Sequence, residues 1–125
     1  KQPPGCLLLA REEANPQAFG VAVLDDDGNI IDVVEKPENP PSNLAIGGIY
    51  LFDETFWDKL DAAVAEKGDA FSISDINRAY IAEDKAEFIS VGAETWVDCG
   101  TPETLLQASI MARDGKLNPR PYRKR

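Results

Sequence analysis

The side chains of this sequence that could do chemistry are mainly carboxylates and lysines, because its 125 residues include no histidine. Histidine is the usual general base, so its absence excludes hydrolases built on Ser-His or Cys-His pairs. The two cysteines, Cys6 and Cys99, lie far apart and form no CxxC motif. A zinc site is therefore not expected, and a reduced, cytoplasmic protein is the simplest interpretation.

Three adjacent carboxylates, Asp25, Asp26 and Asp27, are a first candidate for cation binding. An EF-hand calcium loop needs a glutamate at its twelfth position, and that spacing is absent here. The stretch continues with Gly28 and Asn29, and Asp, Gly and Asn all tolerate turn conformations. We predict a hairpin turn at this place and no calcium site.

Four short motifs contain the remaining candidate residues. They are Phe19-Gly20-Val21, Glu35-Lys36-Pro37, Ser42-Asn43-Leu44-Ala45-Ile46-Gly47-Gly48-Ile49-Tyr50 and Trp96-Val97-Asp98-Cys99-Gly100-Thr101-Pro102-Glu103. In this order and spacing they resemble sugar-1-phosphate nucleotidyltransferases, most of all the C-terminal, sugar-binding half of the glucose-1-phosphate thymidylyltransferase branch. The stretch Ser74-Asp75-Ile76-Asn77-Arg78-Ala79-Tyr80 resembles the family's helix between the third and fourth motifs. The similarity runs from Gly5 to Ser109.

This resemblance implies the transfer of a nucleotidyl group to a sugar-1-phosphate. In the family, an oxygen of the sugar phosphate attacks the α-phosphate of a nucleoside triphosphate, and pyrophosphate leaves. Such a reaction needs two polyanions held in line, with Mg²⁺ and cationic side chains neutralising their charge. The resemblance therefore implies a sugar-1-phosphate and Mg²⁺ as ligands, and the α/β fold of the sugar-binding half of a nucleotide-diphospho-sugar transferase.

Glu35 and Lys36 are the central pair of this implied site. By the resemblance, the Lys36 ammonium contacts the phosphate, and the Glu35 carboxylate accepts hydrogen bonds from sugar hydroxyls. Lys36 is the only basic residue between Arg11 and Lys59, and its ammonium is a compact point charge. Neighbouring strand residues point to opposite faces, so both side chains can meet one ligand only if the strand bends before Pro37.

The resemblance assigns four further residues to ligands. Gly20 lies with its backbone against the sugar, where the missing Cβ allows a close approach. Ile46 contacts the sugar through its backbone, and Tyr50 either walls the sugar pocket or packs in the core. Asp98 helps to hold magnesium, because a hard cation prefers carboxylate oxygen.

The sequence also departs from the family pattern. Family members carry a glycine-rich loop of the form G-x-G-x-R-L, which wraps the triphosphate with backbone amides and which these residues do not contain. A second magnesium aspartate is missing as well, and Lys67 is a candidate phosphate contact only in place of a family arginine. We expect a chain that lacks the nucleotide-binding half, is inactive alone, and has a homodimer mate or a separate nucleotide-binding half as partner. The alternatives are a non-catalytic sugar-phosphate-binding or oligomerisation module and a purely structural α/β domain.

The elements that must position these residues follow from apolar periodicity and turn signals. We predict helices that begin after the caps Asp53, Ser74 and Thr101. We predict strands over residues 6–10, 19–24, 30–35, 44–52, 86–91 and 95–99. This order of strands and helices predicts the α/β class, with a mixed β-sheet covered by helices.

Charge and length limit the partners and the domain count. The net charge is −9, so we expect no nucleic-acid binding. No apolar run approaches the ~20 residues of a membrane-spanning helix, so we expect no membrane partner. We expect one domain over residues 1–112. A basic tail over residues 113–125 is then a solvated end or a contact for an acidic partner.

Overall fold

The computed structural model describes residues 5–92 and 96–117, which belong to two compact units that divide after Gly92. The first unit holds one β-sheet and two α-helices, and the second holds one α-helix. Within the described residues, no helix combines the length and the apolar character needed to cross a membrane.

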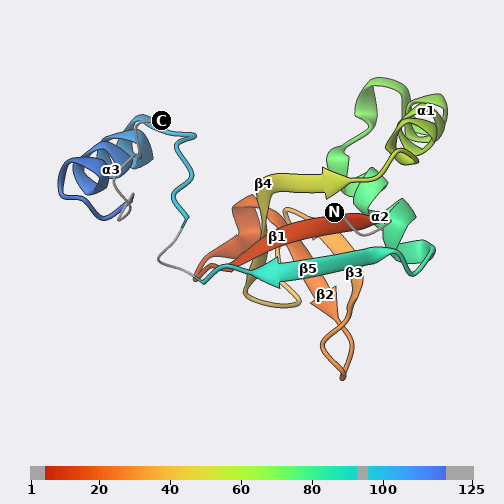
Figure 1. The fold of residues 1–125 in the computed structure, drawn as a ribbon, viewed down its shortest axis with the longest axis horizontal. Helices are drawn as coiled ribbons and strands as arrows, with labels where there is room; N and C mark the ends of the chain where they lie inside the picture. The colour runs from red at the N-terminus through yellow and green to blue at the C-terminus, as the bar shows by residue number, and fades with distance from the viewer. Residues whose placement is uncertain (1–4, 93–95, 118–125) are drawn as a thin grey trace, which may run out of the picture. The chain divides into compact units, whose positions relative to one another are not determined.

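Five strands form a single mixed sheet in the first unit (Figure 1). They are β1 (Cys6–Glu12), β2 (Gly20–Leu24), β3 (Ile30–Glu35), β4 (Leu44–Phe52) and β5 (Ala86–Ser90). Their spatial order is β3-β2-β4-β1-β5. Strand β1 pairs antiparallel with β4 and parallel with β5, and β2 pairs antiparallel with β3 and β4. The predicted mixed α/β fold is confirmed.

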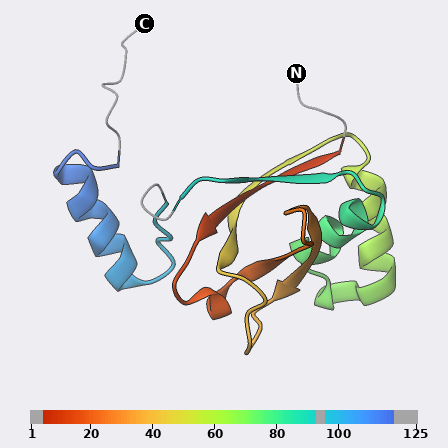
Figure 2. The ribbon, with the colours of Figure 1, turned by 90° about the horizontal axis from the view of Figure 1, so that it is seen from below.

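The helices are α1 (Phe56–Lys67) and α2 (Ile73–Ala82) in the first unit and α3 (Pro102–Arg113) in the second. Two short 3-10 turns, η1 (Pro16–Ala18) and η2 (Gly68–Ala70), connect other elements. Helix α2 packs against β3 and β5, which stand at opposite ends of the strand order and also approach each other. The sheet is therefore curled, with α2 against its inner side (Figure 2).

The core lies between the curled sheet and α2. On β1, Cys6, Leu8 and Ala10 are buried while their neighbours are partly exposed, as the two-residue period of a strand requires. Ile76 and Tyr80 bring the apolar face of α2 into the same cluster. Burial of this apolar surface is what holds α2 in the curl.

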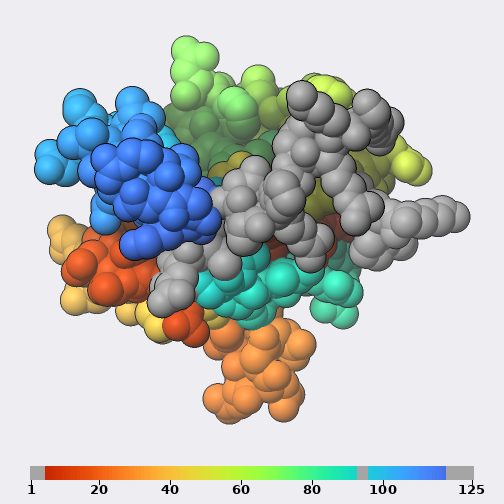
Figure 3. Space-filling view, turned by 60° about the vertical axis from the view of Figure 1, so that its left-hand side comes forward, coloured from red at the N-terminus to blue at the C-terminus, as the bar shows by residue number. Residues whose placement is uncertain are grey.

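Strands β2 and β3 form the predicted hairpin. The Asp25 carboxylate accepts hydrogen bonds from the backbone N–H groups of Asp27 at 3.0 Å and Asn29 at 2.8 Å. Gly28 takes a φ of 85°, a value that glycine adopts without strain. Figure 3 shows the turn projecting from the surface. Asp25 thus closes the turn through its side chain, as an Asx turn does.

The predicted cap of α2 is wrong. The helix begins after Ser72 rather than at Ser74. Asp75 lies three residues beyond Ser72, and its carboxylate accepts a hydrogen bond from the Ser72 backbone N–H at 2.9 Å. This reciprocal arrangement is a capping box, and it leaves the Ser74 hydroxyl free for another partner.

The other two predicted helix starts have different outcomes. Helix α1 begins at Phe56 with Thr55 as its N-cap residue, two residues later than predicted. Asp53 still accepts a hydrogen bond from the Thr55 backbone N–H at 3.0 Å. The predicted start of α3 is confirmed, because the Thr101 side chain accepts a hydrogen bond from the Thr104 backbone N–H at 3.2 Å.

The strand predicted over residues 95–99 is wrong for residues 96–99, none of which belongs to a strand. Residue 95 and residues 118–125 of the predicted basic tail lie outside the described residues. A strand needs a neighbouring backbone with unpaired hydrogen-bonding groups. Over residues 96–117, α3 is the one regular element of the second unit, so no strand is described there that could pair with this stretch.

Asp53, at the end of β4, joins three parts of the first unit. Its carboxylate accepts hydrogen bonds from the Gly5 backbone N–H at 2.8 Å, the Thr55 hydroxyl at 2.6 Å and the Tyr80 hydroxyl at 2.8 Å. The hydrogen bond from the Thr55 side chain is the largest cause that lowers the pKa of Asp53 from 3.8 to about 2. Burial raises the pKa of Tyr80 to about 12, so its hydroxyl stays a donor at neutral pH.

The Asp53 network predicts an acid-dependent contribution to stability. Because the folded pKa of Asp53 is depressed, its contribution is fully present above about pH 4 and is lost as the pH falls towards 2. We expect Asp53→Asn to be less stable than the wild type at neutral pH and the two stabilities to converge towards pH 2. Urea unfolding across this pH range measures the difference. A difference between the two chains that does not shrink with acid would contradict this assignment.

Candidate functional site

The candidate site begins where β2 starts and β3 ends. Gly20 and Glu35 are direct partners in the antiparallel register of these two strands. The Glu35 side chain is exposed to solvent. The hairpin therefore brings together two of the residues predicted to contact a sugar, although they lie far apart in the sequence.

Helix α2 supplies a hydrogen-bond partner to Glu35. The Ser74 hydroxyl donates to Glu35 Oε2 at 2.8 Å, and Ser74 itself is buried. A Cβ at Gly20 would lie 3.3 Å from the same Oε2, 3.5 Å from Ser74 Oγ and 3.3 Å from Val33 Cγ1. The missing side chain of Gly20 thus leaves the room in which the hydroxyl and the carboxylate meet.

Lys36 stands at a bend directly after β3. Its φ is 44°, a left-handed value that is uncommon for a residue other than glycine. Its backbone N–H donates to the Phe19 carbonyl at 2.9 Å, which holds this bend against the start of β2. Contact of Glu35 and Lys36 with one ligand requires a bend before Pro37, and the chain bends at Lys36.

The Lys36 ammonium has no ion-pair partner among residues 5–92 and 96–117. Within residues 5–92, every other basic side chain has an ion-pair partner, and Lys36 is the exception. Lys67, the other candidate phosphate contact, already pairs with Asp75 at 2.6 Å. A free, exposed cation in a strongly acidic chain can attract an anionic ligand.

Tyr50 and Ile46 lie on β4 at different depths. Ile46 is buried in the core cluster, so only its backbone is available for the predicted contact with a ligand. Tyr50 is half-buried and its ring lies parallel to that of Phe52, with centroids 5.9 Å apart. Burial, and then the negative charge of Glu35, raise the pKa of Tyr50. Its phenol therefore keeps its proton at neutral pH and lies near enough to Glu35 to sense its charge.

Asp98 belongs to the second unit and is exposed. No group of three or more histidine, cysteine or acidic side chains that could hold a metal ion occurs among residues 5–92 and 96–117. A single carboxylate does not hold Mg²⁺ by itself, but Mg²⁺ is commonly bound by one or two carboxylates together with substrate phosphates. The magnesium role of Asp98 therefore stays a prediction, in which this carboxylate supplies one oxygen ligand.

The two cysteines are free thiols. Cys6 is buried, and its burial, together with the charge of Asp53, raises its pKa to about 12. A thiol with such a pKa is not a thiolate at neutral pH and does not act as a nucleophile. Cys99 is exposed in the second unit.

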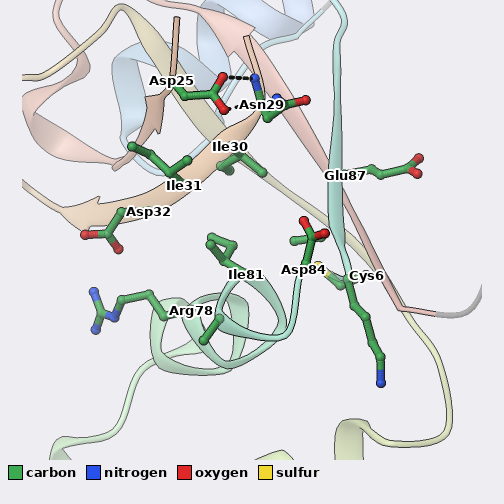
Figure 4. Close-up of a pocket in the computed structure, with 13 residues that line it drawn as sticks. Cys6, Asp25, Asn29, Ile30, Ile31, Asp32, Arg78, Ile81, Asp84 and Glu87 are labelled. Carbon is green, nitrogen blue, oxygen red and sulfur yellow. Dashed lines mark hydrogen bonds between the residues drawn. The ribbon is translucent and has the colours of Figure 1, made fainter. Parts of the chain in front are cut away.

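An open hollow of about 840 Å³ lies elsewhere in the first unit, between the β2–β3 turn, α2 and β5 (Figure 4). Its two basic side chains, Arg78 and Lys85, are already paired with carboxylates. The hollow contains none of the residues predicted to bind a sugar phosphate. Its acidic side chains are Asp25, Asp32, Asp84 and Glu87. The excess of negative charge makes this hollow a poor site for a phosphate.

Sequence reasoning missed the part that Ser74 plays in this cluster. It assigned Ser74 to a helix cap, which the structure gives to Ser72. The one available signal was a pair of serines two residues apart, of which Ser72 alone has an acidic residue three positions later. Its partner Glu35 lies 39 positions away in the sequence, so local patterns could not identify it.

Comparison with known proteins assigns the family. A family model described as nucleotidyl transferase matches residues 1–115. The chain belongs to this nucleotidyl transferase family. It is 40% identical over 112 residues to the bifunctional protein GlmU of Methanocaldococcus jannaschii and 32% identical over 111 residues to the glucose-1-phosphate thymidylyltransferase of Mycolicibacterium smegmatis.

Solved structures share the fold of this nucleotidyl transferase family member. A provisionally named glucose-1-phosphate thymidylyltransferase from Bacillus anthracis, in complex with a sucrose, matches with a TM-score of 0.80 and 31% identity over 90% of the chain. A UDP-glucose pyrophosphorylase with UDP-glucose has the same fold, with a TM-score of 0.75 and 24% identity.

The chain spans only part of each relative. The alignment with the M. jannaschii protein includes 89% of this chain and 27% of that protein. The alignment with the M. smegmatis protein includes 87% of this chain and 38% of that protein. The chain covers 45% of the B. anthracis structure. The matches thus show the family of this chain. They do not assign to it the activity of a whole relative.

The crowding at Gly20 gives a test with a matched control. Glycine to alanine in a strand normally stabilises by about 0.5–1 kcal/mol, because glycine loses more backbone freedom on folding. We expect Gly48→Ala to show this gain, since nothing lies within 4 Å of a Cβ there. Gly20→Ala should gain nothing or lose stability, because Val33 and Glu35 stand in the way. Urea unfolding of the two variants checks this. An equal gain at both positions would contradict the crowding.

Proposed function

We propose that this chain binds the sugar-1-phosphate in a nucleotidyl transfer reaction, with glucose-1-phosphate as the first substrate to test. The observation that carries the proposal is Lys36, which stands at a bend directly after the exposed Glu35 and whose ammonium has no ion-pair partner among residues 5–92 and 96–117. A residue held in a sparsely populated backbone conformation often marks a ligand site. Relatives named glucose-1-phosphate thymidylyltransferase support the choice of sugar phosphate.

In this proposal, each residue contacts a different part of the ligand. Lys36 places its positive charge against the phosphate, and Glu35 accepts hydrogen bonds from the sugar hydroxyls. Gly20 lets the sugar approach the backbone, and Ile46 offers backbone groups from β4. Tyr50, protonated at neutral pH, offers a phenol O–H as a donor at the wall of the pocket.

In the proposed reaction, these contacts hold a phosphate oxygen of the sugar in line with the α-phosphate of a nucleoside triphosphate. Positioning of this kind supplies much of the catalysis in phosphoryl-type transfers. Magnesium, when bound, would neutralise charge on the phosphates, and Asp98 would contribute one of its oxygen ligands. We further propose that residues 1–112 act as one domain in this role, in a reduced, cytoplasmic setting.

Lys36→Ala tests the proposed phosphate contact. Loss of a charge-assisted contact should weaken the binding of glucose-1-phosphate by about tenfold or more, while the urea midpoint stays within error because Lys36 has no ion-pair partner within residues 5–92. Isothermal titration or NMR titration of the 125-residue chain measures the affinity.

The matched control is Lys85→Ala, which removes an exposed lysine paired with Glu83 at 3.3 Å. It changes the net charge by the same amount and should leave the affinity unchanged. Equal losses in both variants would mean that only the overall charge matters, and saturable binding that survives Lys36→Ala would remove Lys36 from the site.

A turnover assay tests how much chemistry these residues perform without further chain. The 125 residues contain no G-x-G-x-R-L loop to cradle a triphosphate. We therefore expect the chain, mixed with thymidine triphosphate, glucose-1-phosphate and Mg²⁺, to release pyrophosphate no faster than a blank. A coupled phosphate assay measures the release. Sustained release that disappears in Lys36→Ala would show that triphosphate binding resides in these residues too.

A further inference from the structure

Ser74 is a buried polar side chain with a long-range partner. It is 3% exposed, and its hydroxyl donates to Glu35 Oε2 at 2.8 Å across 39 positions of sequence. The hydroxyl is not needed for the helix, because Ser72 and Asp75 already form the capping box of α2.

The bond fixes one oxygen of the carboxylate and leaves the other available. An ionised carboxylate accepts hydrogen bonds at both oxygens. Oε2 of Glu35 is occupied by Ser74, whereas Oε1 has no hydrogen-bond partner among the residues that the structure describes. The Glu35 side chain is exposed, so without an anchor it would sample several rotamers.

Gly20 and Tyr50 also contribute to the surroundings of the Glu35 carboxylate. Gly20 lies across the strand pair from Glu35, and its missing Cβ leaves space for Oε2 and for the Ser74 hydroxyl. Tyr50 lies near enough for the Glu35 charge to raise its pKa, so its phenol stays neutral and does not repel the carboxylate. The Glu35 carboxylate therefore has one anchored oxygen and one open oxygen at the surface.

We propose that Ser74 is a positioning residue, which holds the Glu35 carboxylate in the one rotamer that presents Oε1 to a sugar hydroxyl. The inference rests on the proposed sugar-phosphate site and adds a specificity-determining residue to it. Ser74 itself does not touch the ligand. Ser74 restricts the rotamers of Glu35 before the ligand binds, so binding costs less side-chain entropy. The sugar then meets an acceptor that is already oriented.

The first arm of the test needs no ligand. NMR scalar couplings of Glu35 in the free 125-residue chain report its χ1 distribution. We expect one dominant rotamer in the wild type and in Ser74→Thr, which keeps the hydroxyl, and averaging over rotamers in Ser74→Ala. A Glu35 side chain that is averaged in the wild type, or unchanged by Ser74→Ala, would overturn the positioning role. Urea unfolding confirms that each variant is folded.

The second arm uses glucose-1-phosphate and inorganic phosphate as probes. Ser74→Ala should weaken the binding of glucose-1-phosphate about five- to tenfold, as expected for loss of one hydrogen bond to a charged group. Its affinity for inorganic phosphate, which has no sugar hydroxyl to meet Glu35, should not fall. The Glu35→Ala variant should show the same pattern. The double variant, Ser74→Ala with Glu35→Ala, should lose no more affinity for glucose-1-phosphate than Glu35→Ala alone.

The outcomes separate the two proposals. If the wild type does not bind glucose-1-phosphate, the proposed function fails, and with it the specificity role of Ser74, whatever the rotamers show. If the wild type binds and Ser74→Ala binds equally well while Glu35→Ala does not, the function stands and the role of Ser74 is overturned. Equal losses for both probes in Ser74→Ala would also overturn it, because a general structural defect moves both affinities.

Discussion

One buried face of α2 ties the ends of two strands, β3 and β4, to the core. At its start, Ser74 donates to Glu35, and near its end Tyr80 donates to Asp53. Glu35 is the last residue of β3, and Asp53 directly follows β4. The apolar residues between these contacts supply the burial that holds the helix in the curled sheet. The amide of Asn77, on the same buried face, has no hydrogen-bond partner among the described residues.

The elements that depend on local sequence could be predicted. The hairpin follows from Asp25 and Gly28, whose turn chemistry needs only neighbouring residues. The start of α3 follows from Thr101 for the same reason. The first residue of α2 could not be predicted in this way, because Ser72 and Ser74 are both preferred residue types for an N-cap. The Ser74 hydroxyl donates to Glu35 on β3, and no local rule describes that contact.

For the candidate site, the sequence suggested residues but not their geometry. The resemblance named Gly20, Glu35 and Tyr50. The structure pairs Gly20 with Glu35 across two strands, and the charge of Glu35 adds to the raised pKa of Tyr50. That the chain turns at Lys36 with a φ of 44° could not be predicted, since lysine seldom adopts this conformation. The bend arises from tertiary context, where the backbone of Lys36 is hydrogen-bonded to Phe19.

If the chain binds a sugar-1-phosphate as proposed, the opposite charges of the neighbouring residues Glu35 and Lys36 explain how the site would prefer a sugar phosphate to free phosphate. Lys36 attracts either anion, but the Glu35 carboxylate repels both, in a chain whose net charge is already −9. A sugar offsets that repulsion with hydroxyl groups that donate to Glu35, whereas inorganic phosphate at neutral pH offers little in return. Specificity would then come from the Glu35 carboxylate, which repels any anion and which only a ligand with hydroxyl groups can compensate by donating hydrogen bonds. Such discrimination needs the carboxylate held in place, because a mobile Glu35 could swing away from free phosphate and let it bind.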